Sequence, residues 1–292
     1  MTAVSIRESR SRAATSARPL YVYFGHHKCA STWLSDIVAD VCSGAGLRTA
    51  SVHNPRVFDG DLAAFVERRH VDFLLYVNAN VRFVSQLAGF RGFHVIRDPR
   101  DIVVSSYFSH LHSHPTDDWP ELVDHRRELA QVNQEEGILL VLDFLAGVLD
   151  DIATWDYDDP RIVELKMEDL VRAPEAALAD AFVRMGLADP AMGRANAAVV
   201  GALAAAKRRR SRIVPMRLAR LPTTVVQDAV RRHAFEKKAG GRRPGTEDVR
   251  SHYRKGVLGD WVNHFTPRHR RAFKERYGEL LVRLGYETGM DW

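Results

Sequence analysis

Short apolar runs alternate along the chain with stretches in which apolar residues recur every three or four positions. The runs Leu20–Phe24, Val71–Val77, Gly92–Ile96 and Arg161–Leu165 have the length and bulk of buried strands. The stretches that follow have the period of amphipathic helices. This alternation predicts an α/β fold with a central parallel sheet flanked by helices. In such a sheet the ligand lies beyond the carboxyl ends of the strands.

Capping residues delimit the predicted helices. The helix after the first run is predicted to end at Gly44–Gly46. The helix after the third run begins at Asp98, with Pro99 in its first position and Asp101 as the acid of a capping box. Another helix is predicted to open near Pro174 and to end before the next glycine.

The last third of the chain differs in composition from the part before it. Residues 202–245 are rich in Arg, Lys and Gly and predict helix and loop over the edge of the sheet. A final helix is predicted with Thr266 as its cap, Pro267 as its first residue and Gly285 at its end.

Length, charge and cysteine content narrow the class of protein. The 292 residues predict a single domain over 19–292, preceded by a disordered arm over 1–18 that lacks the apolar core of a signal peptide. Two cysteines provide no disulfide framework, which predicts a cytoplasmic protein, and the Arg- and Ala-rich composition favours a bacterial source. No apolar run reaches the roughly 18 residues of a membrane span. The net charge of +5 favours an anionic ligand.

The loop after the first run carries candidate phosphate-binding groups. In Gly25–Thr32, small residues lead from a strand into a helix, where backbone N–H groups can converge on an anion. Lys28 adds a positive charge, and Ser31 and Thr32 add hydroxyl donors. The loop lacks the G-K-[ST] sequence of nucleotide hydrolases, because Lys28 precedes Ser31 by three positions. Taken alone, the loop fits an anion site and an ordinary turn equally well.

Two further segments offer phosphate clamps. Arg97 lies at a predicted strand end, and Ser105 follows two helical turns later. Arg254, Lys255 and the N–H of Gly256 lie on a glycine-containing loop. Arginine binds phosphate in a bidentate manner and lysine binds it as a point charge.

Together these segments resemble the signature motifs of the PAPS-dependent sulfotransferases, where PAPS is 3′-phosphoadenosine 5′-phosphosulfate. Residues 26–33, HHKCASTW, resemble the 5′-phosphosulfate loop Y-P-K-S-G-T-x-W. Residues 97–105, RDPRDIVVS, resemble the 3′-phosphate motif, and residues 254–261, RKGVLGDW, resemble the closing R-K-G-x-x-G-D-W. Residues 164–170, ELKMEDL, resemble the strand-end element Y-E-D-[LM]. The resemblance spans about residues 20 to 285, in the order of the family.

The resemblance implies a P-loop-NTPase-like sulfotransferase fold and transfer of a sulfuryl group from PAPS to an acceptor hydroxyl or amine, without a metal. Lys28 would hold the bridging oxygen of the phosphosulfate and act in catalysis. Trp33 and Phe235 would flank the adenine, although plain core packing is the other interpretation of both rings. The remaining implied cofactor contacts are Ala30, Ser31, Thr32, Arg97, Ser105, Arg254, Lys255 and Gly256.

The general base is the point at which the sequence departs from the family. Asn78 stands where many members carry a histidine, and an amide does not accept a proton. His53 lies in the window where other branches carry a glutamate, and Asn-Pro after it would end a strand. His53 is therefore the predicted base. His26 or His27 beside Lys28, and the histidines of residues 110–114, are the alternatives.

Other classes of function remain open at this stage. A nucleotide-dependent kinase would share the strand–loop–helix geometry, but it requires G-K-[ST]. The basic run 207–212 fits a nucleic-acid patch, a solvated face or a guide for anionic ligands; without interleaved aromatic residues, nucleic acid is the least favoured. The predicted partner is a small-molecule, lipid or glycan acceptor, and the sequence sets neither its identity nor the oligomeric state.

Overall fold

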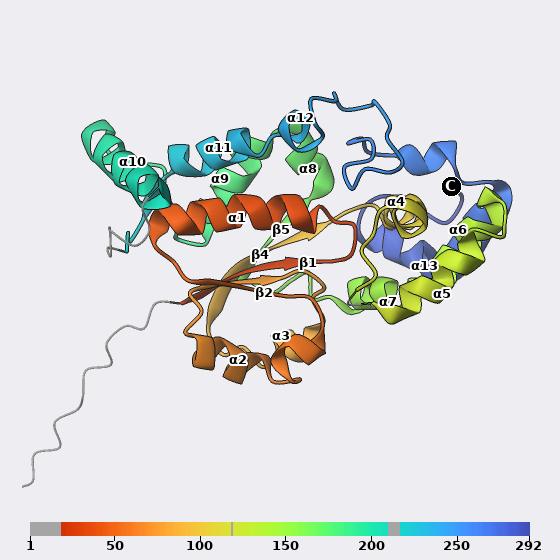
Figure 1. Ribbon diagram of the computed structural model, residues 1–292. Coiled ribbons are helices and arrows are strands. Elements are labelled where there is room, and N and C mark those ends of the chain that lie inside the picture. The colour runs from red at the N-terminus through yellow and green to blue at the C-terminus, as the bar shows by residue number, and fades with distance from the viewer. Residues whose placement is uncertain (1–18, 118, 210–216) are drawn as a thin grey trace, which may run out of the picture.

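A five-stranded parallel sheet forms the centre of the protein. The computed structural model describes residues 19–117, 119–209 and 217–292 (Figure 1). The strands are β1 (Leu20–Gly25), β2 (Thr49–Val52), β3 (Phe73–Tyr76), β4 (Phe90–Ile96) and β5 (Ile162–Lys166). Their order in the sheet is β2-β3-β1-β4-β5, and all pairs are parallel. The predicted α/β architecture is confirmed, whereas the predicted arm over 1–18 lies outside the described residues.

Helices cover both faces of this sheet because its strands bury alternate residues on opposite sides. Tyr21 and Tyr23 pack into a core with α1 (Ser31–Ala45), α9 (Pro174–Arg184) and α11 (Thr223–Arg232). Val22 and Phe24 pack into a second core with α2 (Leu62–Arg69) and α3 (Val81–Val84), which lie below the sheet in Figure 1. Such two-sided burial is what continuous apolar strands require.

A third core lies beyond one end of the sheet. It joins α4 (Pro99–His112), α6 (Gln134–Phe144), α7 (Ala146–Thr154) and α13 (Pro267–Arg283). The other elements are η1 (Pro55–Phe58), α5 (Pro120–Leu129), α8 (Met167–Arg172), β6 (Ala188–Asp189), α10 (Arg194–Arg209), β7 (Leu221–Pro222), α12 (Phe235–Lys238) and η2 (Asp260–Asn263). Among the described residues, no helix combines the length and apolar character that crossing a membrane requires.

Most of the predicted helix ends are confirmed. Gly46 ends α1 in the left-handed conformation, and Thr266 caps α13 in a capping box with His269. Asp98 caps α4 as predicted. The capping-box role of Asp101 is wrong, because its carboxylate accepts the backbone N–H groups of Gly259 and Trp261 instead. The backbone N–H of Gly259, 158 positions away in the sequence, donates to the Asp101 carboxylate that a capping box would use. Local spacing does not reveal a contact between residues so far apart.

Strand order decides which loops meet. β1 and β4 are neighbours in the sheet, with Gly25 opposite Val95. The loop after β1 and the segment after β4 therefore leave the same edge side by side, and they bring Lys28 next to Arg97. The Arg97 Nη1 atom lies 3.4 Å from the carbonyl oxygen of Lys28.

Candidate active site

The loop between β1 and α1 is bent into an unusual backbone shape. Lys28 and Ala30 both have positive φ, at 62° and 59°, without being glycine. Ala30 is the N-cap of α1, and no side chain caps the helix. The free N–H groups of the first turn are thus left for another acceptor at the positive end of the helix dipole. Strained non-glycine residues of this kind concentrate at ligand sites.

This loop borders a cavity of about 730 Å³. All of the residues predicted to bind the cofactor line it: Lys28, Ala30, Ser31, Thr32, Trp33, Arg97, Ser105, Phe235, Arg254, Lys255 and Gly256. They come from the β1–α1 loop, α1, the β4–α4 segment, α4, α12 and the segment before η2. The structure therefore brings together segments more than two hundred residues apart in the sequence.

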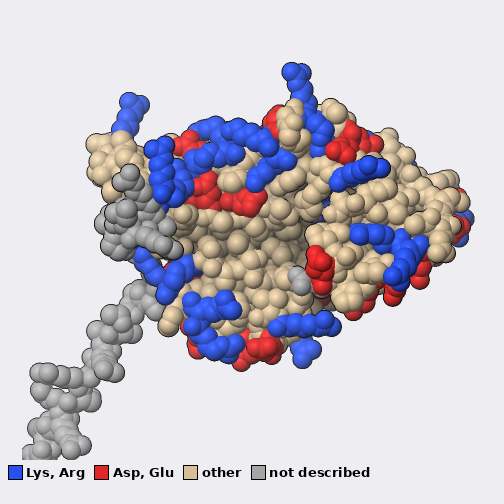
Figure 2. All heavy atoms as spheres, viewed as in Figure 1, with Lys and Arg blue, Asp and Glu red and all other residues tan. Residues whose placement is uncertain are grey.

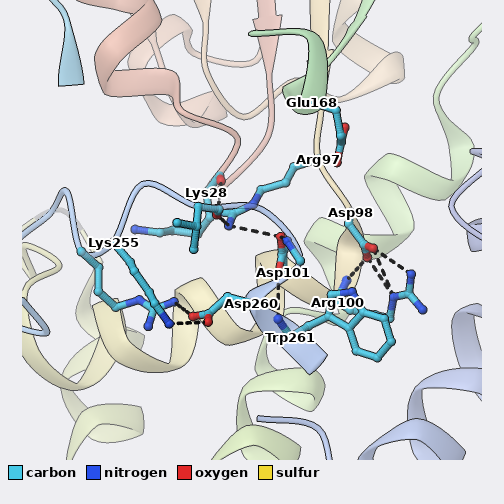
Figure 3. A network of polar contacts seen from close by, with 12 residues as sticks. Lys28, Arg97, Asp98, Arg100, Asp101, Glu168, Lys255, Asp260 and Trp261 are labelled. Carbon is cyan, nitrogen blue, oxygen red and sulfur yellow. Dashed lines mark hydrogen bonds and ion pairs between the residues drawn. The ribbon is translucent and has the colours of Figure 1, made fainter. Parts of the chain in front are cut away.

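Three cations crowd the cavity near the loop. Burial, together with the positive charges of Arg97 and Arg254, lowers the pKa of Lys28 to about 7. Arg97 forms an ion pair with Asp101 at 3.5 Å, and its Nε atom is buried without a partner among the described residues. Figure 3 shows Lys28 and Arg97 side by side, with Asp101 beneath them. A cluster of this charge favours a multiply charged anion.

Asp260 holds the cations of the third motif. Its buried carboxylate accepts hydrogen bonds from Arg254 and from Lys255, the latter at 2.6 Å (Figure 3). Burial alone would raise the pKa of Asp260, but hydrogen bonds from Lys255, Arg254 and Asn263 outweigh it and hold that pKa well below its usual value. The guanidinium of Arg254 also lies 4.3 Å from the ring centre of Phe108. Arg254 and Lys255 are thereby positioned before any ligand binds.

The second and third motifs are bonded to each other. Besides the two backbone hydrogen bonds to Asp101, the guanidinium of Arg100 lies 3.7 Å from the ring centre of Trp261. Gly256 has φ 66°, and a Cβ atom there would lie 2.6 Å from Cε2 of Phe235. Gly256 is therefore required both by its backbone conformation and by the approach of the Phe235 ring.

The two predicted adenine-flanking rings lie at the cavity wall. Trp33 donates a hydrogen bond of 2.7 Å from Nε1 to the carbonyl oxygen of His233, which fixes the indole. Both Trp33 and Phe235 are partly exposed, so neither is a fully buried core residue. Rings exposed to a cavity are suited to contact a ligand.

Histidines line the cavity, and the sequence analysis singled out only some of them. His27, His114 and His252 all border it. His252 Nε2 lies 3.0 Å from Thr32 Oγ1, a contact between residues 220 positions apart. The one feature of the sequence that points to His252 as a cavity residue is its position two residues before Arg254.

Each of these rings is held neutral. Burial lowers the pKa of His252 to about 4, and the charge of Lys28 acts in the same direction. Burial and Lys28 likewise lower the pKa of His114 to about 4. The cavity therefore contains neutral imidazoles beside permanent cations.

His53 lies apart from this group. It directly follows β2, the edge strand, and does not line the cavity. Asn78 Nδ2 donates a hydrogen bond of 3.0 Å to the carbonyl oxygen of His53. The predicted strand before His53 is confirmed, while its role as a base stays a prediction. His26 is buried on the opposite side of the loop, against His94 and Trp155.

The basic run 207–212 is described only in part. Lys207 is buried within α10, and Arg208 forms an ion pair with Asp40 at 3.2 Å. Residues 210–212 lie outside the described residues. Figure 2 shows Lys and Arg side chains gathered over α11, with acidic side chains beside them. Within residues 19–117, 119–209 and 217–292, no group of three or more His, Cys, Asp or Glu side chains is arranged to hold a metal ion.

Comparison with known proteins identifies the fold. No family model matches the sequence, and no curated protein matches it. The crystal structure of mouse sulfotransferase SULT7A1 complexed with PAP is similar with a TM-score of 0.54 and 16% identity, over 91% of this chain and 86% of that chain. The protein therefore has the sulfotransferase fold.

Two other structures are less similar. Retinol dehydratase in complex with androsterone and inactive cofactor PAP has a TM-score of 0.46 and 13% identity, over 91% of this chain and 81% of that chain. A sulfotransferase from Alicyclobacillus acidocaldarius has a TM-score of 0.31 and 14% identity, over 70% of this chain and 98% of that chain.

Proposed function

We propose that this protein is a PAPS-dependent sulfotransferase that moves a sulfuryl group to a hydroxyl or amine of a small-molecule, lipid or glycan acceptor. The observation that carries the proposal is the convergence of the predicted cofactor residues on one cavity. The fold seen in the comparison with the mouse sulfotransferase supports the same conclusion.

The cavity fits a nucleotide with phosphates at both its 3′ and 5′ positions. The N-terminus of α1 is uncapped, and Arg97 Nε is buried without a partner among the described residues. Both are donors that an anion would satisfy. A volume of about 730 Å³ lies within the range of ligand pockets.

Two groups of residues would divide the nucleotide between them. The hydroxyls and backbone of Ser31 and Thr32 would bind the 5′-phosphate, with Ala30 at the turn. The 3′-phosphate would be bound by Arg97, Ser105, Arg254, Lys255 and Gly256. Trp33 and Phe235 would enclose the adenine, where aromatic faces favour stacking.

Lys28 would carry the chemistry on the leaving-group side. PAPS supplies the sulfuryl group and a phosphate oxygen that gains negative charge as the group departs. An ammonium fixed at that oxygen stabilises the transition state more than the ground state. Burial, together with the neighbouring cations, lowers the pKa of Lys28 to about 7, and an anion in the cavity would favour its charged form.

Calorimetry with PAP, 3′-phosphoadenosine 5′-phosphate, tests the proposal. Arg254→Ala should weaken PAP binding at least about 10²-fold, because two charge-assisted hydrogen bonds of roughly 1.5–3 kcal/mol each are lost. Arg250→Ala is the matched control, since Arg250 is exposed, lies four residues earlier and does not line the cavity. Wild-type affinity in Arg254→Ala, or no PAP binding by the wild-type protein, would overturn the proposal.

A further inference from the structure

One histidine lies both in the cavity wall and against a second, deeper histidine. His27 directly precedes Lys28, and its Nε2 atom is 3.0 Å from Nε2 of His110. His27 is 7% exposed, whereas His110 is fully buried in α4. The described residues provide no hydrogen-bond partner for Nδ1 of His27, and that atom is not fully buried. With Nε2 engaged, Nδ1 is the nitrogen left for a group in the cavity.

We infer that His27 is the general base that takes the proton of an acceptor hydroxyl, and that His110 is the residue that positions it. This inference rests on the proposed sulfuryl transfer. The hydroxyl proton passes to Nδ1 of His27 as the acceptor oxygen bonds to sulfur. The electron pair of the broken sulfur–oxygen bond stays on the phosphate oxygen beside Lys28. The sulfated acceptor, PAP and the imidazolium of His27 account for every atom and charge.

His110 can accept a hydrogen bond from Nε2 of His27 when its own proton is on Nδ1, an atom that is buried without a partner among the described residues. His110 is unsuited to take the proton of the acceptor. Burial and the neighbouring His125 and His114 lower its pKa to about 2, so it stays neutral. When both rings are neutral, a single proton lies between the two Nε2 atoms, and one ring donates it to the other. When His27 donates it, Nδ1 of His27 carries a bare lone pair and faces the acceptor as a base. The ring of Trp119, 5.4 Å away at 86°, restricts rotation of the His27 ring.

The charges around His27 make its basicity depend on the nucleotide. The titratable groups that face it are Lys28 from its own loop, His110 and His114 from α4 and the segment after it, and His252 from the loop before η2. Burial lowers the pKa of His27 well below 6.5, and the positive charge of Lys28 acts in the same direction. None of these groups is acidic. An anion bound at Lys28 opposes that field, so the pKa of His27 rises when the nucleotide binds.

The other cavity histidines are less well placed. His252 is engaged with Thr32 Oγ1, the hydroxyl of the proposed phosphate loop. Nδ1 of His114 is buried without a partner among the described residues, and no second histidine is hydrogen-bonded to its ring. Of the three, only His27 is hydrogen-bonded to a second histidine and also keeps a ring nitrogen without a partner.

An acceptor series separates a base from a merely structural residue. With PAPS and a set of aliphatic alcohols and phenols, His27→Gln should lower turnover by about 10²–10⁴ for alcohols. For para-nitrophenol, which is already ionised at an alkaline assay pH, the loss should be about threefold or less, since no proton has to be removed. PAP affinity measured by calorimetry should be retained. His112→Gln is the control, because His112 is exposed on the same helix as His110 and does not line the cavity.

Two further measurements do not depend on turnover. In histidine NMR, the resonance assigned to His27 should titrate at a higher pH with PAP bound than without it. His110→Leu should lower turnover with alcohols, and His110→Gln should restore much of it, because the amide again offers a partner to Nε2 of His27.

The inference fails if His27→Gln loses turnover equally with all acceptors, if His53→Gln shows the selective loss instead, or if PAP leaves the pKa of His27 unchanged. Each of these results is compatible with PAP binding by the wild-type protein. The absence of PAP binding would instead defeat the proposed function itself.

Discussion

At the scale of single residues, Lys28 is the residue whose charge and backbone conformation are least favourable in the free protein. Its ammonium lies among arginines in a half-buried position, where burial and like charge both favour the neutral amine. Its φ of 62° adds backbone strain. Among the residues that the structure describes, no carboxylate forms an ion pair with Lys28 to offset the electrostatic cost. An anionic ligand would offset that cost, because it reverses the local field.

This electrostatic cost predicts proton uptake on binding. The pKa of Lys28 is about 7 in the free protein and rises with an anion bound. Between those two pKa values binding takes up a proton, so PAP affinity should be strongest below pH 7 and fall up to about tenfold per pH unit above it. Calorimetry at pH 8 in buffers of different ionisation enthalpy should detect close to one proton.

Lys28→Arg is the control for this prediction. A guanidinium keeps the positive charge but does not lose its proton, so the uptake and the pH dependence of affinity should both disappear. Persistent uptake in this variant would assign the proton to another group.

At the scale of elements, the first turn of α1 has a backbone that suits ligand binding but lowers the stability of the fold. Ala30 occupies the left-handed N-cap position, at φ 59°, where the family motif carries glycine. The left-handed conformation costs a non-glycine residue roughly 1–2 kcal/mol. The sequence resemblance located the residue, but only the backbone shows that its side chain is strained.

Ala30→Gly should therefore stabilise the protein by about 0.5 kcal/mol, after the greater entropy of glycine in the unfolded chain is subtracted. The matched control is Ala202→Gly, an exposed position within α10, which should cost about 1 kcal/mol. Urea unfolding measures both changes. Equal destabilisation by the two substitutions would show that Ala30 is not strained.

At the scale of the whole molecule, the site exists because distant segments meet at one edge of the sheet. β1 and β4 are adjacent, and the hydrogen bonds of Asp101 attach the segment before η2 to α4. Asp260 then orients Arg254 and Lys255 from within that segment. The proposed 3′-phosphate site is therefore a property of the tertiary structure.

A 3′-phosphate should accordingly dominate affinity. PAP should bind about 10²–10⁴-fold more tightly than AMP, because AMP forfeits at least two charge-assisted hydrogen bonds. The preference should survive a metal chelator, since Lys28, Arg97 and Arg254 supply the positive charge. Equal affinity for PAP and AMP, or dependence on magnesium as for a kinase, would contradict it.

By itself the sequence determined four of the five strands of the central sheet, most of the predicted helix ends and the identity of the cavity cations. Strand and helix periods are local, and parallel strands place the loops after them at one edge. Gly25–Thr32 and Arg97 were therefore predictable neighbours, and the motif resemblance added the segment around Arg254.

Only the tertiary structure decided which side chains touch. His27 meets His110 across 83 positions, and Asp101 binds Gly259 rather than its own helix end. His53 follows a strand, as its sequence context predicts, yet β2 is the edge strand, and His53 lies outside the cavity. Periodicity encodes the face of an element that is buried, whereas the partner across that face depends on strand order and on the path of the chain between elements. Burial and neighbouring charge, which lower the pKa values of Lys28 and the cavity histidines, arise only when those elements assemble.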